Sequence, residues 1–226
     1  MKRLFDVLVS GMALLLLSLL FLGLALLIKL TSKGPVFYRG ERIGLGGRLF
    51  RIFKFRSMVV EAEQAGGPST SGTDPRVTRI GHIIRKFKLD ELSQLINVFL
   101  GDMSLVGPRP EVKHYVDMYT EEEKAILTVR PGITDWSSIK FHNEGEIIAS
   151  SGLADPEEAY MKLIRPEKLQ LQLKYVREHS FVGDIGIILV TLLTLMKSRL
   201  PPPRAGQVPS EEQKGPGEPI KNVIPR

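Results

Sequence analysis

GMALLLLSLLFLGLALLI, residues 11–28, is a stretch of 18 residues that carries no charged side chain. A helix rises about 1.5 Å per residue, so this stretch covers roughly 27 Å, close to the lower limit for crossing a bilayer core of about 30 Å. A cleaved signal peptide would need a shorter apolar region and a cleavage site of small residues, and the sequence shows neither clearly. The stretch therefore predicts a helix that enters a membrane.

The charges on either side of this stretch bear on whether the helix crosses. Lys2 and Arg3 precede it, and Lys29 and Lys33 follow it. Basic flanks prefer the cytoplasmic side, so a straight span leaves one cluster on the unfavourable side, whereas a helix that enters, bends and returns keeps both on one face. Ser18 lies at mid-segment, and its hydroxyl could satisfy backbone groups freed by a break. We therefore expect a re-entrant helix broken at Ser18, with a single-pass anchor as the alternative.

Composition narrows the class of protein. The 226 residues are 43% hydrophobic and include no cysteine, so a core can form without disulfides, thiolate nucleophiles or cysteine-ligated metals. The net charge is +6, but residues 1–60 alone carry +8 and the remainder −2. A basic segment next to an apolar one indicates an anionic lipid surface or phosphate ligands. Its few aromatic residues do not form a stacking platform, so nucleic acid is not an expected partner.

The rest of the chain predicts an α+β fold that is predominantly helical. Two short strands, within 36–39 and 49–55, flank the glycine-rich turn 43–47 and predict a small β-hairpin. A loop is expected at 61–77. Helix signals follow at 92–99, at the capping box formed by Thr120 and Glu123, at Asp155 and Pro156, at 166–179 and at 181–196. The last of these helices is apolar apart from Asp184, which suits either an interfacial helix or a core helix.

The patterns divide the chain into three parts. We expect residues 1–33 to form the membrane helix and its basic flank, and residues 34–200 to form one domain that holds the chemistry. Residues 201–226 contain seven of the 15 prolines and show no apolar periodicity, which predicts a disordered tail.

The stretch that carries chemistry is RKFKLDELSQLINVFLGDMSLVGPRP, residues 85–110. Asp90 and Glu91 open a predicted helix and are surrounded by cations, with Arg85 before them and Arg109 after them between two prolines. Adjacent acids among fixed cations suit a metal-bound phosphate, and an aspartate can also attack phosphorus itself. Taken alone, however, Asp90 could simply cap the helix.

Several motifs in this chain resemble those of the bacterial sugar transferase family, the monotopic phosphoglycosyl transferases, and cover about residues 1–200 in order. They are KRLFD at 2–6, LTSKGPVFY at 30–38, FKFRSM at 53–58, LDEL at 89–92, NVFLGDMSLVGPRP at 97–110 and RPGIT at 130–134. The likeness is to the minimal catalytic unit of that family, and it implies a re-entrant helix at the cytoplasmic face of the bacterial inner membrane, with amphipathic interfacial helices around the active site.

The resemblance also implies a reaction. Asp90 would attack the sugar-bearing phosphorus of a UDP-sugar with Mg²⁺ bound, release UMP, and pass the phosphosugar to a polyprenol phosphate such as undecaprenyl phosphate, the first membrane step of exopolysaccharide or glycoconjugate assembly. Glu91 would assist in metal or proton handling, so both acids are metal-ligand candidates. The implied phosphate- or substrate-binding residues are Arg85 and Arg109, then Lys54, Arg56 and Arg130, and finally Asp184, which matches a family aspartate.

Departures from the family pattern leave points open. The family usually has Ser-Pro at the helix break, whereas Ser18 is followed by Leu19, and DWSSIK at 135–140 replaces a stretch that often contains Gly-Trp and Ala-Gln. The identity of the sugar is therefore open, as is a homodimer. A non-catalytic membrane adaptor and a membrane-held nucleic-acid binder also fit the charge pattern, but neither needs a carboxylate pair among cations.

Overall fold

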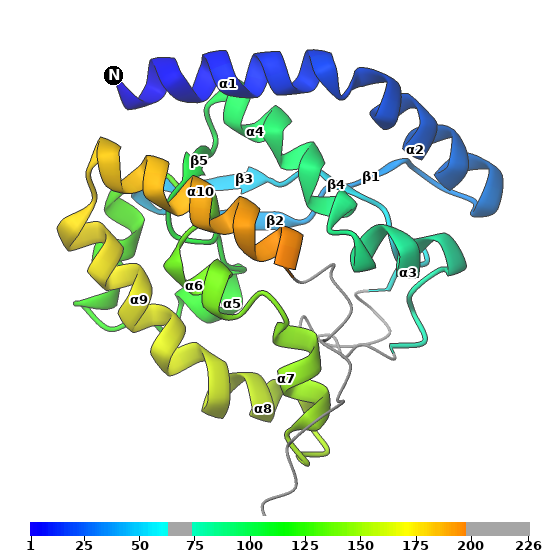
Figure 1. Cartoon of the computed structure of the whole chain (residues 1–226). Helices are drawn as coiled ribbons and strands as arrows, with labels where there is room; N and C mark the ends of the chain where they lie inside the picture. Colours follow the sequence, from blue (N-terminus) through cyan, green and yellow to red (C-terminus); the bar gives the residue numbers. More distant parts are fainter. Residues whose placement is uncertain (63–73, 198–226) are drawn as a thin grey trace, which may run out of the picture.

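The computed structural model describes residues 1–62 and 74–197, so most of the expected loop at 61–77 and the whole expected tail at 201–226 lie outside the described residues. The described chain is mostly helical with three short strand pairs, as Figure 1 shows. The α-helices are α1 (Lys2–Leu16), α2 (Ser18–Thr31), α3 (Arg79–Lys86), α4 (Gln94–Leu100), α5 (Lys113–Val116), α6 (Trp136–Lys140), α7 (Glu144–Ser150), α8 (Pro156–Ala159), α9 (Arg165–Glu178) and α10 (Phe181–Lys197). The tighter or wider turns are the 3-10 helices η1 (Leu45–Gly47), η2 (Leu89–Ser93) and η3 (Glu123–Thr128) and the π-helix η4 (Tyr160–Ile164).

The apolar stretch at the N-terminus forms two helices rather than one. α1 and α2 meet at Leu17 with a bend of 61° (Figure 1). Within the described residues no single helix is both long and apolar enough to cross a membrane, although this bent pair passes that test when its two helices are taken together. The break lies one residue before the predicted Ser18, which starts α2.

Among residues 1–62 and 74–197, no hydrogen bond of the Ser18 hydroxyl supports its predicted role at the break, which stays a prediction. No side-chain hydrogen bond caps α2. Instead, the backbone ladder continues through the bend, because the Leu17 amide donates to the Ala13 carbonyl at 2.9 Å and the Phe21 amide donates to the Leu17 carbonyl at 2.9 Å. The bend therefore leaves the amide and the carbonyl of Leu17 paired, without a proline at the break.

The inner face of α1 is polar where it docks on the rest of the chain. Asp6 is buried there, and its carboxylate accepts hydrogen bonds from the Ser104 hydroxyl at 2.9 Å and the Leu105 amide at 3.0 Å. At its start, the Lys2 ammonium contacts Asp184 of α10 at 2.5 Å and donates to the Val106 carbonyl at 2.9 Å. These contacts fix α1 to the strand that precedes residues 107–110.

Replacing Asp6 by alanine should lower the free energy of unfolding by about 2–4 kcal/mol, because two buried donors lose a charged acceptor. Urea unfolding in detergent, followed by the fluorescence of the single tryptophan, measures the change. The control is Asp117→Ala, which removes an exposed carboxylate paired with Lys113 on α5 and should cost less than about 1 kcal/mol. Equal losses in the two variants would contradict the docking role of Asp6.

The predicted β-hairpin is present but divided into two antiparallel pairs. β1 (Phe37–Tyr38) pairs with β4 (Lys54–Phe55), and β2 (Glu41–Ile43) pairs with β3 (Leu49–Arg51) around the glycine turn. Between the pairs one backbone bond remains, from the Ile52 amide to the Gly40 carbonyl at 3.0 Å. A side chain of α4 adds two more bonds: Asn97 accepts from the Phe53 amide at 2.7 Å and donates to the Arg51 carbonyl at 3.0 Å. Asn97 therefore holds the strand that carries Lys54.

A third strand pair was not expected from the sequence. β5 (Ser104–Val106) and β6 (Gly132–Thr134) run parallel, with Ser104 opposite Gly132 and Val106 opposite Thr134. The chain after β5 passes so close to β6 that a Cβ on Gly107 would lie 2.4 Å from the Arg130 carbonyl oxygen. Only glycine fits this approach, which directs the following residues toward the cavity described below.

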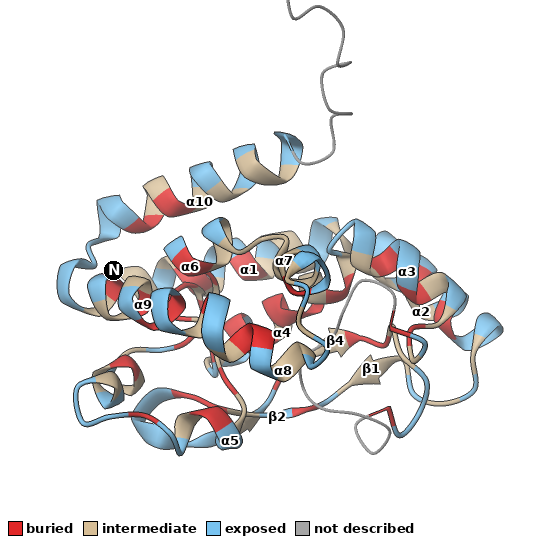
Figure 2. Cartoon of the chain, turned by 90° about the horizontal axis from the view of Figure 1, so that it is seen from below, coloured by how far each residue is buried: buried red, intermediate tan, exposed pale blue. Residues whose placement is uncertain are grey.

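The C-terminal helices confirm the expected helix positions. The Thr120–Glu123 capping box forms both of its hydrogen bonds, and Asp155 caps α8 with Pro156 at its first turn. Figure 2 shows that α9 and α10 bury residues along the side facing the rest of the chain and expose the other side. On α10 the buried positions are Asp184 and Ile187, while outward residues such as Leu192 and Met196 are exposed.

Candidate active site

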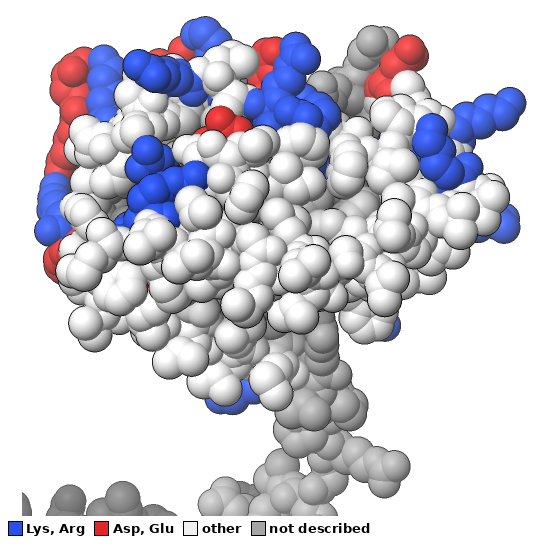
Figure 3. All heavy atoms as spheres, turned by 90° about the horizontal axis from the view of Figure 1, so that it is seen from above, with Lys and Arg blue, Asp and Glu red and all other residues white. Residues whose placement is uncertain are grey.

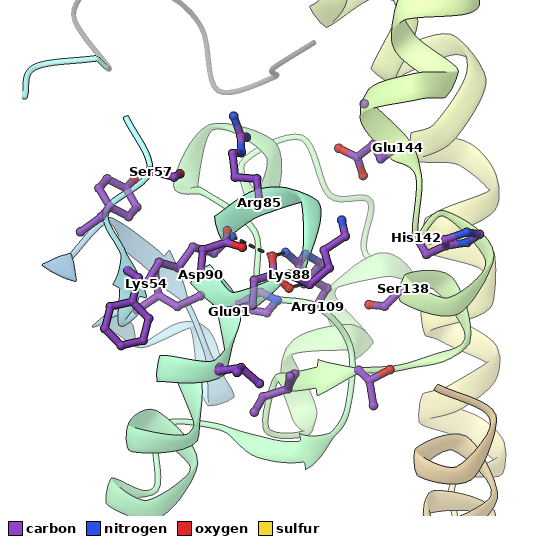
Figure 4. Close-up of a pocket in the computed structure, with 18 of the residues that line it drawn as sticks. Lys54, Ser57, Arg85, Lys88, Asp90, Glu91, Arg109, Ser138, His142 and Glu144 are labelled. Carbon is purple, nitrogen blue, oxygen red and sulfur yellow. Dashed lines mark hydrogen bonds and ion pairs between the residues drawn. The ribbon is translucent and has the colours of Figure 1, made fainter. Parts of the chain in front are cut away.

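The Asp90–Glu91 pair lies in η2, on the wall of a large cavity. α3 ends at Lys86, and Lys88 takes the left-handed conformation (φ 54°), which turns the chain sharply into η2. η2 packs against β4, and α4 continues from it until Gly101, whose φ of 104° ends the helix. The predicted helix at Asp90 is thus a 3-10 turn followed by an α-helix, and this arrangement presents both carboxylates to the cavity (Figure 4).

Glu91 is held by two cations from different parts of the chain. The Lys54 ammonium contacts Glu91 Oε1 at 2.9 Å. The Arg109 guanidinium binds both carboxylate oxygens, through Nη2 to Oε1 and through Nη1 to Oε2 at 3.1 Å. Burial alone would raise the pKa of Glu91, but the attraction and hydrogen bonds of Arg109 and Lys54 together outweigh it and hold that pKa well below its usual value. Glu91 is therefore an ionised brace between the two cations.

Asp90 has the opposite environment. Asp90 is only 8% exposed, and its Oδ1 is buried without a hydrogen-bond partner among residues 1–62 and 74–197. Burial raises the pKa of Asp90, the negative charge of Glu91 raises it further, and Lys54, Arg85 and Lys88 only partly offset this. The pKa values of two adjacent carboxyl groups thus differ, with that of Asp90 raised and that of Glu91 lowered. Such a difference is typical of sites where one acid reacts and the other stays ionised.

Five of the residues predicted for the site meet at this wall of the cavity. Figure 4 shows Arg85 above the acid pair, with Lys54 on one side and Arg109 on the other. These five residues are Lys54, Arg85, Asp90, Glu91 and Arg109. The guanidinium groups of Arg85 and Arg109 and the ammonium group of Lys54 can donate hydrogen bonds to phosphate oxygens. Asp90 Oδ1, which no described residue pairs with, can contact a reacting atom or a metal ion.

Three other predicted residues have different partners. Arg56 borders the cavity, but its guanidinium donates to the Lys33 carbonyl at 2.7 Å and the Ser32 carbonyl at 2.9 Å, at the end of α2. Arg130 donates to the Gly101 carbonyl at 3.2 Å, at the end of α4. Asp184 contacts Lys2 and accepts from the Tyr175 hydroxyl at 2.8 Å. Arg56 and Arg130 thus bind carbonyl groups at the ends of α2 and α4, and Asp184 joins α10 to α1.

The cavity extends well beyond the acid pair. Its volume is about 2020 Å³, and its far wall comes from α6 and α7. Ser138 and Glu144 lie on that wall, facing the acid pair across the space (Figure 4). Glu144 belongs to no recognisable motif and was not predicted, whereas Ser138 lies in DWSSIK at 135–140, the stretch that departs from the family pattern and leaves the sugar open. The packing of α6 and α7 brings both residues to this wall.

The residues around Asp90 and Glu91 fit a magnesium ion that binds together with the phosphates of a substrate. Among residues 1–62 and 74–197, no three His, Cys, Asp or Glu side chains are grouped as a set of metal ligands. Mg²⁺ commonly uses one or two carboxylates and completes its octahedron with phosphate oxygens and water. The unpartnered Oδ1 of Asp90, a hard oxygen donor next to a second carboxylate, matches this limited requirement.

Comparison with known proteins identifies the family. The model of a family described as bacterial sugar transferase matches residues 1–198. The chain belongs to this family. The acid pair, Lys54 and Arg109 all lie within the matched residues of this sugar transferase.

Curated relatives share the same region. The chain is 38% identical over 198 residues to the UDP-N-acetylgalactosamine-undecaprenyl-phosphate N-acetylgalactosaminephosphotransferase of Aeromonas hydrophila, covering 86% of this chain and 43% of that protein. It is 40% identical over 205 residues to the undecaprenyl-phosphate glucose phosphotransferase of Komagataeibacter xylinus, covering 88% and 36% respectively. It is 32% identical over 213 residues to the exopolysaccharide production protein ExoY of Rhizobium meliloti, covering 88% and 86%. The chain thus spans about two fifths of the first two relatives and most of the third.

Proposed function

We propose that this sugar transferase moves a sugar-1-phosphate from a UDP-sugar to undecaprenyl phosphate and releases UMP. The observation that carries the proposal is the buried, unpartnered Oδ1 of Asp90, next to a carboxylate braced by Arg109 and Lys54. The names of both phosphotransferase relatives support undecaprenyl phosphate as the acceptor, and the name of the Aeromonas relative also supports a UDP-sugar donor. The name of the third supports a place in exopolysaccharide production.

In the first step, Asp90 acts as the nucleophile. A carboxylate oxygen of Asp90 attacks the phosphorus that bears the sugar, the bond from this phosphorus to the oxygen bridging the two phosphates breaks, and UMP leaves with that oxygen. The product is an aspartyl phosphosugar. A desolvated carboxylate with few hydrogen bonds suits this role, because little solvation must be removed before attack.

In the second step, a phosphate oxygen of undecaprenyl phosphate attacks the same phosphorus. The Asp90 carboxylate leaves unchanged, and the product is undecaprenyl-diphosphate-sugar. Arg109 and Arg85 supply positive charge to the phosphoryl oxygens in both steps, while Glu91 keeps Arg109 and Lys54 in place. Mg²⁺, held through the carboxylates of Asp90 and Glu91, would neutralise charge that develops on the transferred phosphoryl group.

A lipid acceptor requires the site to lie near a membrane surface. α1, α2 and α10 expose rows of large apolar residues, including Leu8, Leu26 and Leu192. Figure 3, which views the molecule from the α1 side, shows a broad field of uncharged residues with Lys and Arg along its margins. We infer that this face enters the cytoplasmic leaflet of the bacterial inner membrane, with α1 and α2 as a re-entrant pair, since the bend supports this better than a straight span.

A direct assay tests the proposed function. The protein in detergent or nanodiscs is incubated with a panel of UDP-sugars, undecaprenyl phosphate and Mg²⁺, and both UMP release and lipid-linked sugar are measured. We expect both products in equal amounts with at least one donor. Mass spectrometry after incubation with that donor alone should show a phosphosugar added at Asp90. Lipid product without any added mass at Asp90 would contradict the two-step route.

The activity should also depend on pH through Asp90. Because the pKa of Asp90 lies above its ordinary value of 3.8 and the nucleophile must be ionised, kcat/KM should rise with pH through that elevated pKa. Lys88→Gln removes a positive charge that lowers this pKa, so the acid limb should move to higher pH. The pH profile of kcat/KM measures both effects. An acid limb at the ordinary aspartate value, unmoved in Lys88→Gln, would contradict the assignment.

A further inference from the structure

The far wall of the cavity has two polar groups without protein partners. Ser138 Oγ is buried and makes no hydrogen bond with the part of the chain that the structure describes. The Glu144 carboxylate makes no hydrogen bond or ion pair with any residue in the described parts of the chain, 1–62 and 74–197. Figure 4 shows the Glu144 carboxylate directed from α7 toward the acid pair and the Ser138 hydroxyl directed toward Arg109. Buried polar atoms are nearly always paired, so the buried Ser138 hydroxyl on a cavity wall indicates a ligand that pairs with it, and the half-buried Glu144 carboxylate is positioned to bind the same ligand.

Charge determines which part of a ligand can face this wall. The near wall concentrates cations, so the two phosphates of a donor bind there. Glu144 is close enough to this wall that, after Glu91, its negative charge contributes to raising the pKa of Arg109. A carboxylate in that position repels phosphate and can only accept hydrogen bonds. The group opposite Glu144 must therefore be uncharged and rich in hydrogen-bond donors.

We propose that Glu144 and Ser138 form a subsite that binds the hydroxyl groups of the transferred sugar and so contribute to the choice of UDP-sugar. This inference rests on the proposed function and adds the residues that select the donor. Glu144 accepts hydrogen bonds from one or two sugar hydroxyls, and the Ser138 hydroxyl pairs with another oxygen of the ring. Each of these hydrogen bonds replaces one to water. A UDP-sugar that lacks the matching hydroxyl therefore leaves Glu144 or Ser138 without a partner.

Two other occupants of this wall fit less well. Glu144 and the acid pair are not grouped as ligands of one metal ion anywhere in the described residues. The ribose of the donor also has hydroxyls, but a second phosphate separates it from the phosphorus that Asp90 attacks. The transferred sugar is bonded to that phosphorus directly, so it is the hydroxylated group nearest to Arg109 and hence to Glu144.

The test compares Glu144→Gln with wild type on UDP-glucose, UDP-galactose, UDP-N-acetylglucosamine and UDP-N-acetylgalactosamine. For the best donor we expect kcat/KM to fall about 10- to 100-fold, the loss of one hydrogen bond to a charged group. Inhibition by UMP, which has the ribose but no transferred sugar, should change less than about twofold. Deoxy analogues of the best donor identify the hydroxyl, because its removal should impair wild type but not Glu144→Gln. Ser138→Ala should give a smaller loss, also without an effect on UMP.

The matched control is Glu158→Gln, which removes an exposed carboxylate of α8 that pairs with Lys162 and should leave every constant unchanged. An unchanged donor preference in Glu144→Gln would overturn the subsite. So would a loss of UMP inhibition as large as the loss of kcat/KM, because it would place the ribose or the phosphates at Glu144. Wild-type protein that transfers no sugar from any UDP donor would instead contradict the proposed function itself. Thermal unfolding of each variant establishes that the protein compared is folded.

Discussion

Asp90→Asn is expected to lower kcat/KM by at least about 10³-fold, the largest change in activity that we predict. Asparagine preserves the shape of the side chain but replaces the nucleophilic carboxylate with an uncharged amide, so donor binding at Arg109 and Lys54 should persist while attack on phosphorus is lost. UMP release over time measures the loss, and intact-mass analysis should show no phosphosugar on the variant. Retention of full activity would exclude Asp90 as the nucleophile.

The same variant should not lose stability. The pKa of Asp90 is raised in the folded protein, so the ionised carboxylate disfavours folding. Its contribution to the free energy of unfolding is therefore most favourable below the unfolded-state pKa and is lost as the pH rises through the folded-state pKa. At neutral pH, Asp90→Asn should have a Tm equal to or above that of wild type, which separates lost chemistry from lost folding. At acid pH the difference in Tm should vanish.

Much of this site was predictable because the residues that matter are close in sequence. Asp90 and Glu91 are adjacent. After them the chain forms one short helix and one strand and then folds back, which brings Arg109 next to Glu91. The resemblance to known motifs then supplied the expected roles. The hairpin was predictable from its glycine turn, and Lys54 sits on its second arm because that arm must pair back to Phe37 and Tyr38.

Other features could not be read from the sequence, because a residue type does not reveal its partner. Arg56 and Arg130 are as suitable for carbonyl oxygens at helix ends as for phosphates, and only the folded chain shows that α2 and α4 end beside them. The strands β5 and β6 are only three residues long, which is too short to show a periodic pattern of apolar residues. Glu144 looks like an ordinary first-turn acid, and only packing places it opposite Arg109.

The second large effect that we predict is a loss of stability when the buried ion pair between Glu111 and Lys168 is broken. Glu111, two residues after Arg109, contacts the Lys168 ammonium at 3.1 Å, and both side chains are nearly inaccessible. Its carboxylate also accepts from the hydroxyls of Tyr160 at 2.9 Å and Tyr119 at 3.2 Å. Glu111→Ala should lower the free energy of unfolding by about 3–5 kcal/mol, because Lys168 is left as a buried charge without a counter-ion. Urea unfolding in detergent measures the loss.

A double variant separates the lost ion pair from lost packing. In Glu111→Gln with Lys168→Met no charge remains buried, so at least half of the loss seen in Glu111→Ala should be recovered. Glu121→Ala is the control, since its exposed pair with Lys124 should contribute less than about 1 kcal/mol. If the double variant is as unstable as Glu111→Ala, packing and not charge explains the loss. Because Arg109 is anchored beside this pair, with Gln172 donating to its carbonyl at 3.4 Å, the folded fraction of Glu111→Ala should also bind the UDP-sugar more weakly. A raised KM in protein that is still folded would connect the buried pair to the phosphate-binding side chain above it.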